Sequence, residues 1–418
     1  MNRRELTEKR SANTKFFENQ DHSITAEIYL DKVHYQDTDG SWKEMDDTLM
    51  EEEAAEDAAE IQSQTEGAAG KTEKDLVNHK GSLSIRFKKQ SNPQGTITME
   101  KDGAGLTWGL EGCNKVKNEQ TEGTVSYAGI LDDVDLRCMV RGERVKEDLI
   151  LKGRKAPESF TYLYKLKKLT PSLAGNRVSF LDEQGEEAFS VSAPYMKDAA
   201  GEQSEAIRLT LEEDKKKQVK VTFTPDPEWL AAPERQYPVV LDPVTTTSKK
   251  AADIEDAYVS SVYEEDNFYN NIYLEIQGGD EIYRSFLKFE LPEIKTGDMI
   301  VGARLVLVSL AENGAERTIQ VHKVLQSWEA DTINWYNKPI YQETVEDSCT
   351  YTGDQQKYIT LDITRLVKDW YQNGNNNGLM LKDPYELSGY TEFLSADCYD
   401  GFQDMRPRIE ISYVNYAG

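Results

Sequence analysis

Positive charge is scarce in this sequence. Its 418 residues hold 49 lysines and arginines against 75 aspartates and glutamates, which gives a formal net charge of −26. From residue 246 onward there are 15 bases and 29 acids, so the later part carries −14 and the earlier part, with 34 and 46, carries −12. Because both parts repel phosphate backbones, the sequence argues against nucleic acid as a partner.

Long apolar runs are also missing. The most apolar stretch, Met299 to Leu310, is interrupted by Arg304 and is shorter than the roughly 18 residues that a membrane-spanning helix needs. The first nine residues are charged and contain no apolar core, so they do not form a signal peptide. We therefore expect no membrane span, and either unconventional export or a chain that is a fragment of a longer protein.

Cysteine and histidine are too few for the common metal and catalytic motifs. Cys113, Cys138, Cys349 and Cys398 lie far apart, which excludes a dense disulfide framework and a simple zinc site but leaves their redox state open. The four histidines stand in no His-Glu-x-x-His motif, and no Gly-x-Ser-x-Gly motif occurs. We expect no catalysis, although paired carboxylates of a polysaccharide-degrading enzyme remain an alternative.

Strand signals dominate what is present. Short segments that alternate between apolar and polar residues recur about every ten residues, with Gly or Asp clusters between them. This spacing is typical of all-β proteins, and we predict two antiparallel, jelly-roll-like β-sandwiches. Residues 24–29 and 41–45 read as an opening β-hairpin. The exception is 362–370, where Ile363, Leu366, Val367 and Trp370 form one helical face, so one short helix is expected in the second domain.

Composition suggests where the domains divide. Residues 51–74 are rich in Glu, Ala, Gln and Gly and are predicted to be a mobile acidic insertion. Residues 245–252 are polar and aperiodic and are predicted to be a linker. The sequence thus predicts one β-rich domain over 1–244 and a second over 253–418.

Motifs of the second domain resemble those of the DNRLRE-type β-sandwich, which is similar to some polysaccharide-binding modules of secreted bacterial proteins. They are residues 256–259, 267–270, 284–289 and 362–364, Trp328, Trp335 and Trp370, and Arg406-Pro407. Residues 267–270 read Asn-Phe-Tyr-Asn, where that family usually has Asn-Tyr-Gly, and the lost glycine changes the turn. The resemblance implies a fold that binds carbohydrate.

Motifs of the first domain resemble the region that precedes the repeats of RHS-repeat and wall-associated toxin proteins of Gram-positive bacteria. They are residues 28–29, 34–37, 40–42, 135–136, 145–147 and 237–243. In that family these segments lie upstream of a large repeat shell and a toxin. The resemblance implies a non-catalytic, secreted or cell-surface part of a larger RHS-type polypeptide.

Residues 328–336 combine aromatic rings with carboxylates and amides, the mixture that stacks on sugar rings and bonds their hydroxyls. Trp335, Tyr336, Asn334 and Trp328 are the predicted ligand-binding residues, and the ligand is a polysaccharide or cell-wall glycan. The alternative is that the tryptophans are core residues, which Trp328 and Trp370 favour because each follows an apolar period. Net charge favours neutral glycans, unless Arg284, Lys288, Arg406 and Arg408 gather into a basic patch.

The turn at 266–271 offers oxygen ligands of the kind that calcium prefers. Asp266, Asn267 and Asn270 are the predicted metal residues, with calcium as the possible cofactor, although a solvated turn explains the same residues. The leading hypothesis is a non-catalytic module whose second domain binds carbohydrate. The main alternative is a structural scaffold or docking domain of a toxin shell.

Overall fold

A computed structural model gives the fold of the chain. It describes residues 3–37, 39–52, 74–121, 124–191, 194–215, 217–242, 244–247, 255–269, 271, 273–295, 297–310, 316–353, 355–386, 389–398 and 405–415. Within these residues it contains 34 strands, two α-helices and one short 3-10 helix, and every strand pairing is antiparallel. The predicted all-β class is confirmed.

The chain divides into two compact units. Unit 1 consists of Met1–Glu44 and Asp253–Gly418, and unit 2 consists of Met45–Ala252. This division differs from the predicted domain over 1–244, because the first 44 residues pack with the second half of the chain. The predicted insertion falls largely on residues 53–73, which lie outside the described residues. The predicted linker at 245–252 is wrong for residues 245–247, which form a paired strand of unit 2, and residues 248–252 lie outside the described residues.

Unit 2 is a β-sandwich with a single core. Trp108, Tyr164 and Phe223 from one sheet and Tyr127 and Phe189 from the other are buried together. The first sheet contains β6 (Asp46–Glu51), β7 (Leu76–Lys80), β8 (Ser84–Phe87), β9 (Ile97–Lys101), β10 (Ala104–Leu110), β15 (Phe160–Lys167), β21 (Ile207–Lys215) and β22 (Gln218–Pro225). The second sheet contains β11 (Glu119–Thr121), β12 (Thr124–Leu131), β13 (Val134–Arg141), β14 (Arg144–Leu151), β16 (Thr170–Ala174), β17 (Arg177–Leu181), β18 (Glu187–Val191), β19 (Tyr195–Lys197), β20 (Gln203–Ser204), β23 (Val239–Asp242) and β24 (Val244–Thr247). The short helix α1 (Pro227–Ala231) starts at Asp226, whose side chain accepts a hydrogen bond from the backbone of Glu228.

Unit 1 is a sandwich built from both ends of the sequence. Ala26 and Ile28 near the start share one core with Leu305, Leu381 and Ile411. Its first layer contains β1 (Arg4–Glu5), β2 (Thr14–Glu18), β3 (Ile24–Tyr29), β34 (Arg408–Val414), β28 (Met299–Ser309) and β31 (Lys357–Asp362). Its second layer contains β25 (Glu255–Ser260), β26 (Tyr273–Gly278), β27 (Tyr283–Lys288), β29 (Glu316–Val324), β30 (Tyr341–Thr352), β32 (Leu379–Lys382) and β33 (Gly389–Leu394). A single pairing, Ser309 with Phe393, joins the two layers at one edge.

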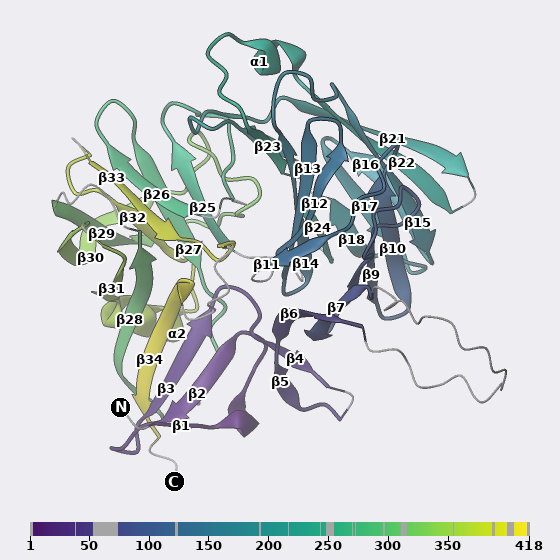
Figure 1. Cartoon of the computed structure of the whole chain (residues 1–418). Coiled ribbons are helices and arrows are strands. Elements are labelled where there is room, and N and C mark those ends of the chain that lie inside the picture. The colour runs from purple at the N-terminus through teal and green to yellow at the C-terminus, as the bar shows by residue number, and fades with distance from the viewer. Residues whose placement is uncertain are drawn as a thin grey trace. The chain divides into compact units, whose positions relative to one another are not determined.

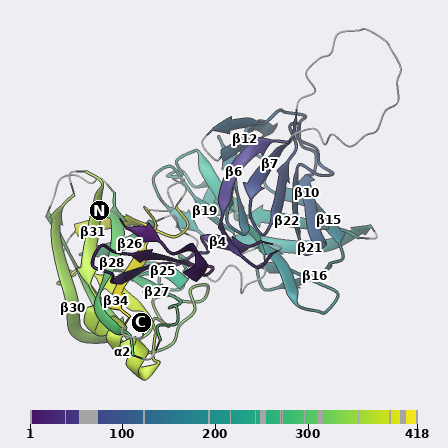
Figure 2. The ribbon, with the colours of Figure 1, turned by 90° about the horizontal axis from the view of Figure 1, so that it is seen from below.

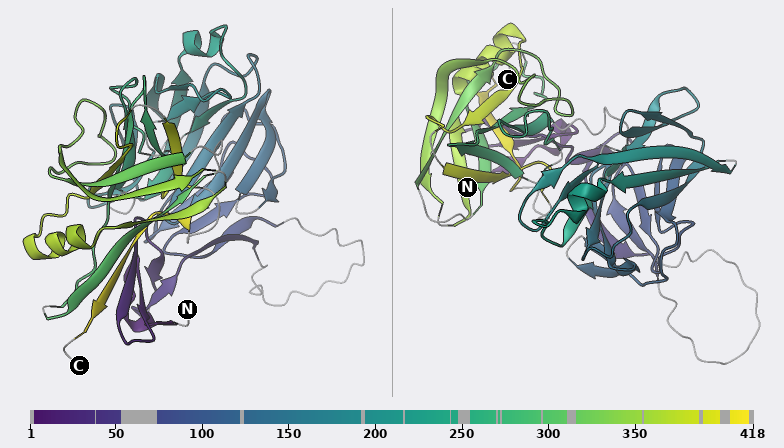
Figure 3. Two further views of the ribbon diagram at one scale, coloured as in Figure 1. Left: turned by 90° about the vertical axis from the view of Figure 1, so that its left-hand side faces the viewer. Right: turned by 90° about the horizontal axis from the view of Figure 1, so that it is seen from above.

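The N-terminal strands extend the first layer directly. Strand β3 pairs with β2 on one side and with β34 on the other, where Ile24 faces Tyr413 and Tyr29 faces Arg408. In Figures 1, 2 and 3 the purple N-terminal strands lie beside the yellow C-terminal strand. The predicted hairpin between 24–29 and 41–45 is therefore wrong. All six β3 residues are buried, and the turn at 36–40 instead joins β4 (His34–Gln36) to β5 (Trp42–Glu44).

The expected helix is present as α2 (Thr364–Asn373). Leu366, Val367 and Trp370 are buried, as the spacing predicts, and Gly374 ends the helix in the left-handed conformation. The Asp362 carboxylate accepts a hydrogen bond of 2.8 Å from the Thr364 backbone, although it does not occupy the cap position itself. Trp370 is thus a core residue.

Candidate functional site

The two loops predicted to bind sugar and metal meet in unit 1. One follows β25, and the other lies between β29 and β30. The Asn267 side-chain amide donates to the carbonyls of Ala330 (2.7 Å) and Ile333 (2.6 Å). The Trp335 backbone donates to the Glu264 carbonyl at 3.1 Å. Residues that the sequence separates by about 70 positions therefore form one surface element, called here the aromatic loop (residues 263–269 and 328–338).

Trp328 lies below the surface of the aromatic loop. Its side chain is packed edge-on to Phe286 with 5.8 Å between ring centroids, and its indole nitrogen donates to the Asn377 carbonyl at 2.9 Å. Only 6% of the residue is exposed. A ring buried to this extent offers no face to a sugar, so the structure favours the core interpretation of Trp328 over its predicted role in ligand binding.

Trp335 is half-buried and lies among cations. The Lys338 ammonium is 3.8 Å from the ring centroid and donates to the Trp335 carbonyl at 2.6 Å. The Arg284 guanidinium is 5.2 Å from the same centroid. Because the Lys338 ammonium lies over one face of the Trp335 ring, a sugar cannot stack on that face. Trp335 is therefore a support for the loop with a restricted accessible surface.

Tyr336 is the exposed aromatic of the loop, with 66% of its surface accessible. Its hydroxyl donates to the Glu264 carboxylate, which fixes the ring position. The Asn334 side-chain oxygen accepts from the backbones of Tyr336 (3.0 Å) and Asn337 (3.1 Å). Asn334 thus shapes the turn, and Tyr336 presents the ring.

Basic residues surround this ring system. Arg284 makes a two-pronged ion pair with Glu386, at 2.7 and 3.0 Å, and Lys382 lies 3.2 Å from the same carboxylate. Both cations are also within 6 Å of the Tyr341 ring centroid. Burial opposes ionisation of Glu386, but its bonds to Arg284 lower its pKa on balance. Burial, and then the charge of Arg284, lower the pKa of Lys338.

The four basic residues considered as a possible patch do not gather. Arg284 pairs with Glu386, Lys288 with Glu255 (3.0 Å), Arg406 with Asp31 (3.5 Å) and Arg408 with Glu410 (2.9 Å). A different group, Arg284 with Lys338 and Lys382, collects around the aromatic loop. Net charge alone did not predict this grouping of three cations, which lie among the acids of the loop.

The predicted calcium turn is used partly for structure. The Asn267 amide donates to the other segment of the aromatic loop at Ala330, and its side-chain oxygen is 3.4 Å from the Tyr269 backbone nitrogen. Burial, followed by repulsion from Glu265, raises the pKa of Asp266. Asn270 lies outside the described residues. Calcium binding here stays a prediction.

Sequence reasoning missed a second group of metal-type ligands, Glu5, His34 and Glu44. His34 is fully buried and its Nδ1 lies 2.6 Å from the Ser11 carbonyl. Arg10 already binds Glu5 at 2.7 Å, and Lys15 binds Glu44 at 3.0 Å. Because two side-chain cations neutralise both carboxylates, a divalent cation would meet strong repulsion, and we assign no metal to this cluster.

Comparison with protein families finds one matching model. It is described as carbohydrate-binding module family 96 and matches residues 247–400, well under half of the chain. The match includes both parts of the aromatic loop. It supports the expected carbohydrate-binding β-sandwich in the second half.

The similar curated proteins are bacterial nucleases. The chain is 24% identical to the tRNA nuclease WapA of Bacillus subtilis strain 168 and, equally, to the tRNA3(Ser)-specific nuclease WapA of Bacillus spizizenii. Each alignment covers 98% of this chain and 18% of the relative, so the chain spans under a fifth of their length. A solved exo-β-1,3-galactanase from Phanerochaete chrysosporium aligns at 8% identity over 98% of this chain and 95% of the galactanase, with a TM-score of 0.12, which is too low to compare folds. Within the described residues, no helix is long and apolar enough to cross a membrane.

Proposed function

We propose that the chain is a non-catalytic module of a larger secreted or cell-surface polypeptide, and that its second half binds carbohydrate through the aromatic loop. The observation that carries the proposal is the position of Tyr336, an exposed ring fixed by Glu264, inside the region that matches a carbohydrate-binding family. A ring held rigidly at the surface loses little entropy when a sugar stacks on it. Three neighbouring cations add donors for sugar hydroxyls.

The charge of the loop agrees with the net charge of the chain. The aromatic loop contains five acids, Glu264, Glu265, Asp266, Glu329 and Asp331, against one base, Lys338. Arg284 and Lys382 beside it are both paired with Glu386. The preference for neutral glycans therefore applies to the aromatic loop, and uronate chains belong in its test as the contrasting ligands.

Two of the four histidines, His34 and His322, support a role without chemistry. His34 and His322 are buried, and each has its Nδ1 within hydrogen-bond distance of a backbone carbonyl, of Ser11 and Gln342 respectively. Burial lowers the pKa of both imidazoles. Such residues suit a structural role better than proton transfer at a solvent-accessible site.

A glycan array with the purified chain tests the proposal. Retention of at least one polysaccharide is expected, and Tyr336→Ala should weaken it by about 1–2 kcal/mol, or roughly tenfold, because a stacking platform is lost. Leu173→Ala, which trims an exposed apolar residue of unit 2, is the control and should change nothing. Absence of any bound glycan would favour the scaffold alternative. Release of reducing sugar or cleavage of tRNA would contradict the non-catalytic assignment.

A further inference from the structure

Unit 1 carries a groove that is separate from the aromatic loop. It lies on the outer face of the layer formed by β3, β34, β28 and β31 and has a volume of about 1200 Å³. Core residues of these strands, such as Ile28, Leu305 and Ile411, point to the opposite side. The groove is thus the solvent face of a sheet whose other face is fully packed.

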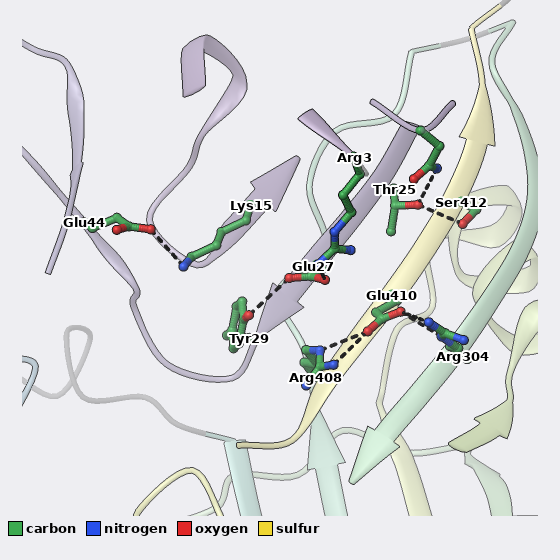
Figure 4. A network of polar contacts seen from close by, with 11 residues as sticks. Arg3, Lys15, Thr25, Glu27, Tyr29, Glu44, Arg304, Arg408, Glu410 and Ser412 are labelled. Carbon is green, nitrogen blue, oxygen red and sulfur yellow. Dashed lines mark hydrogen bonds and ion pairs between the residues drawn. The ribbon is translucent and has the colours of Figure 1, made fainter. Parts of the chain in front are cut away.

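Strand register arranges the groove residues in rows. Glu27 of β3 is opposite Glu410 of β34, Glu410 is opposite Arg304 of β28, and Arg304 is opposite Asp362 of β31. The neighbouring row contains Thr25, Ser412 and Gly302. Figure 4 shows the side chains of Glu27, Glu410, Arg304, Thr25 and Ser412 on this face. One charged row therefore runs beside a shallow row of hydroxyls that ends at a glycine.

The charged row contains an arrangement that opposes folding. Glu27 and Glu410 face each other directly, and they are only 5% and 6% exposed. Like charges at opposite positions of an antiparallel pair repel, and burial strengthens that repulsion. Arg3 neutralises Glu27 at 2.6 Å, while Arg304 (2.6 Å) and Arg408 (2.9 Å) neutralise Glu410 (Figure 4). Local conflicts of this kind concentrate at functional sites.

The hydroxyl row is ordered but has spare bonding capacity. The Thr25 and Ser412 hydroxyls are 3.1 Å apart, and the Asn19 amide donates to the Thr25 hydroxyl at 2.8 Å. A hydroxyl offers one donor and two acceptor positions, so the half-buried Ser412 hydroxyl can exchange further bonds with a ligand. Thr25 is only 7% exposed, and its hydroxyl holds that of Ser412 in position. Opposite Ser412, a Cβ placed on Gly302 would meet no atom within 4 Å. The floor of the groove is thus open at this glycine.

The side chains that line the groove indicate which class of ligand it can bind. Five acids, Asp21, Glu27, Asp347, Asp362 and Glu410, stand against the three arginines 3, 304 and 408, an excess of two negative charges. This excess repels uronates, phosphates and sulfates. Among the described residues, none that lines the groove is aromatic, so a ligand would be held by hydrogen bonds rather than by stacking. Carboxylates, guanidinium groups and hydroxyls in close rows match the adjacent hydroxyls of sugar rings.

We propose that this groove binds a segment of an uncharged polysaccharide through hydrogen bonds, as a site distinct from the aromatic loop. The proposal rests on the proposed carbohydrate-binding function and extends it to residues outside the family match. Thr25 and Glu27 lie before residue 247, and Glu410 and Ser412 lie after residue 400. The N-terminal segment is then part of the binding surface as well as of the fold.

A blocking substitution tests the site in the full chain. Gly302→Leu places a side chain over the hydroxyl row where no atom stands in its way, and Gly302 has no positive φ, so the fold should tolerate it. Gly153→Leu in unit 2 is the matched control, because that glycine is equally unobstructed. Thr25→Val removes the hydroxyl without adding bulk. Circular dichroism and melting temperature verify that each variant is folded.

Affinity electrophoresis in gels that contain dextran, β-glucan, galactan, polygalacturonate or chitosan measures the binding. For at least one neutral polymer, Gly302→Leu should weaken retardation tenfold or more, Thr25→Val should weaken it severalfold, and Gly153→Leu should have no effect. If the unmodified chain binds a polysaccharide and Gly302→Leu binds it equally well, the proposal that the groove binds sugar is wrong, while the proposed function stands. If the parent binds none of the polymers, the proposed function fails with it. If Gly302→Leu weakens the binding of polygalacturonate or chitosan but of no neutral polymer, the proposal that the ligand is uncharged is wrong.

Discussion

The two units reach the same architecture by different routes through the sequence. Unit 2 is contiguous from Met45 to Ala252, whereas unit 1 joins 1–44 to 253–418. They also place their charges differently. Unit 2 buries Lys146, Glu147, Asp148 and Asp242, whereas unit 1 places Glu27 and Glu410 beside arginines that line a groove. Both units therefore bury carboxylates, but in unit 1 the arginines that pair with them also line a groove, where a ligand can reach them.

The strongest test of this comparison is separation of the units. A fragment with residues 253–418 lacks β3, which leaves β34 paired with β28 on one side only and removes Phe16, Ala26 and Ile28 from the core. We predict that it fails to fold, because several buried side chains are lost at about 1.5–3 kcal/mol each. A fragment with residues 45–247 should fold by itself. Proton NMR dispersion of each fragment is the measurement.

A peptide with residues 3–44, added in trans to the 253–418 fragment, is the control for this test. Recovery of dispersed signals would identify the missing strands as the cause of the failure. If 253–418 folds without the peptide, the N-terminal segment is an accessory of unit 1 and not a part of its core.

The next largest effect concerns two aromatic residues of unit 1. Trp328→Ala should lower the free energy of unfolding by about 3–5 kcal/mol, because it leaves a cavity beside Phe286 and removes a hydrogen bond to Asn377. Tyr336→Ala should change it by less than about 1 kcal/mol, because the ring is exposed. Urea denaturation of both variants distinguishes them. Equal losses of stability would contradict the contrast drawn within the aromatic loop.

Unit 2 should lose stability as pH rises from about 4 to 8. Burial raises the pKa of Glu147 to about 8, although Trp108 donates to it at 2.9 Å, and burial raises that of Asp242 to about 6 despite Lys146. A carboxyl with a raised folded pKa takes up a proton on folding between its unfolded and folded pKa values. Its stabilising contribution is therefore complete below the unfolded pKa and decreases through pH 8, by up to a few kcal/mol.

Thermal melts between pH 4 and 9 measure this dependence. Glu147→Gln, which keeps a polar group beside Trp108 but cannot ionise, should flatten the profile of unit 2. The change should appear only in the transition that is assigned to unit 2. An unchanged slope in Glu147→Gln would assign the pH dependence to other groups.

The smallest effect is expected from calcium. If Asp266 and Asn267 bind the ion, millimolar calcium should raise the melting temperature of unit 1 by a few degrees through mass action. Asp266→Ala should abolish the shift, and magnesium should not reproduce it. Identical melting curves in calcium and in chelator would leave the turn with a structural role only.

Sequence patterns correctly predicted the features that depend on neighbouring residues, namely the strand-rich class and helix α2. The all-β class follows from strand periodicity, and α2 follows from the spacing of Ile363, Leu366, Val367 and Trp370. Helix α1 was not predicted, because it has only five residues, although Asp226-Pro227 is a helix-start signal. The membership of 1–44 in unit 1 depends on β3 pairing with β34, across 387 positions between Thr25 and Ser412. No local pattern carries that information.

The candidate site, like the fold, was predictable only where local sequence decides it. Sequence located the loop at 328–336 and gave reasons to place Trp328 in the core. It did not show that Lys338 and Arg284 lie against Trp335, because these contacts depend on packing between separate strands. The groove was missed entirely. Its rows form only when four strands from four separate parts of the chain are in register.

The pairing of β3 with β34 also determines how the molecule would carry mechanical load. The chain leaves unit 1 after Glu44 and returns to it at Asp253, so unit 2 is inserted within a single connection of unit 1. A pull applied between residues 3 and 415 is transmitted through the hydrogen bonds of β1, β2, β3 and β34 (Figure 1). Unit 2 bears no tension until those strands separate. The pairing of the N-terminal strands with β34 should therefore keep tension off the inserted unit until these strands separate.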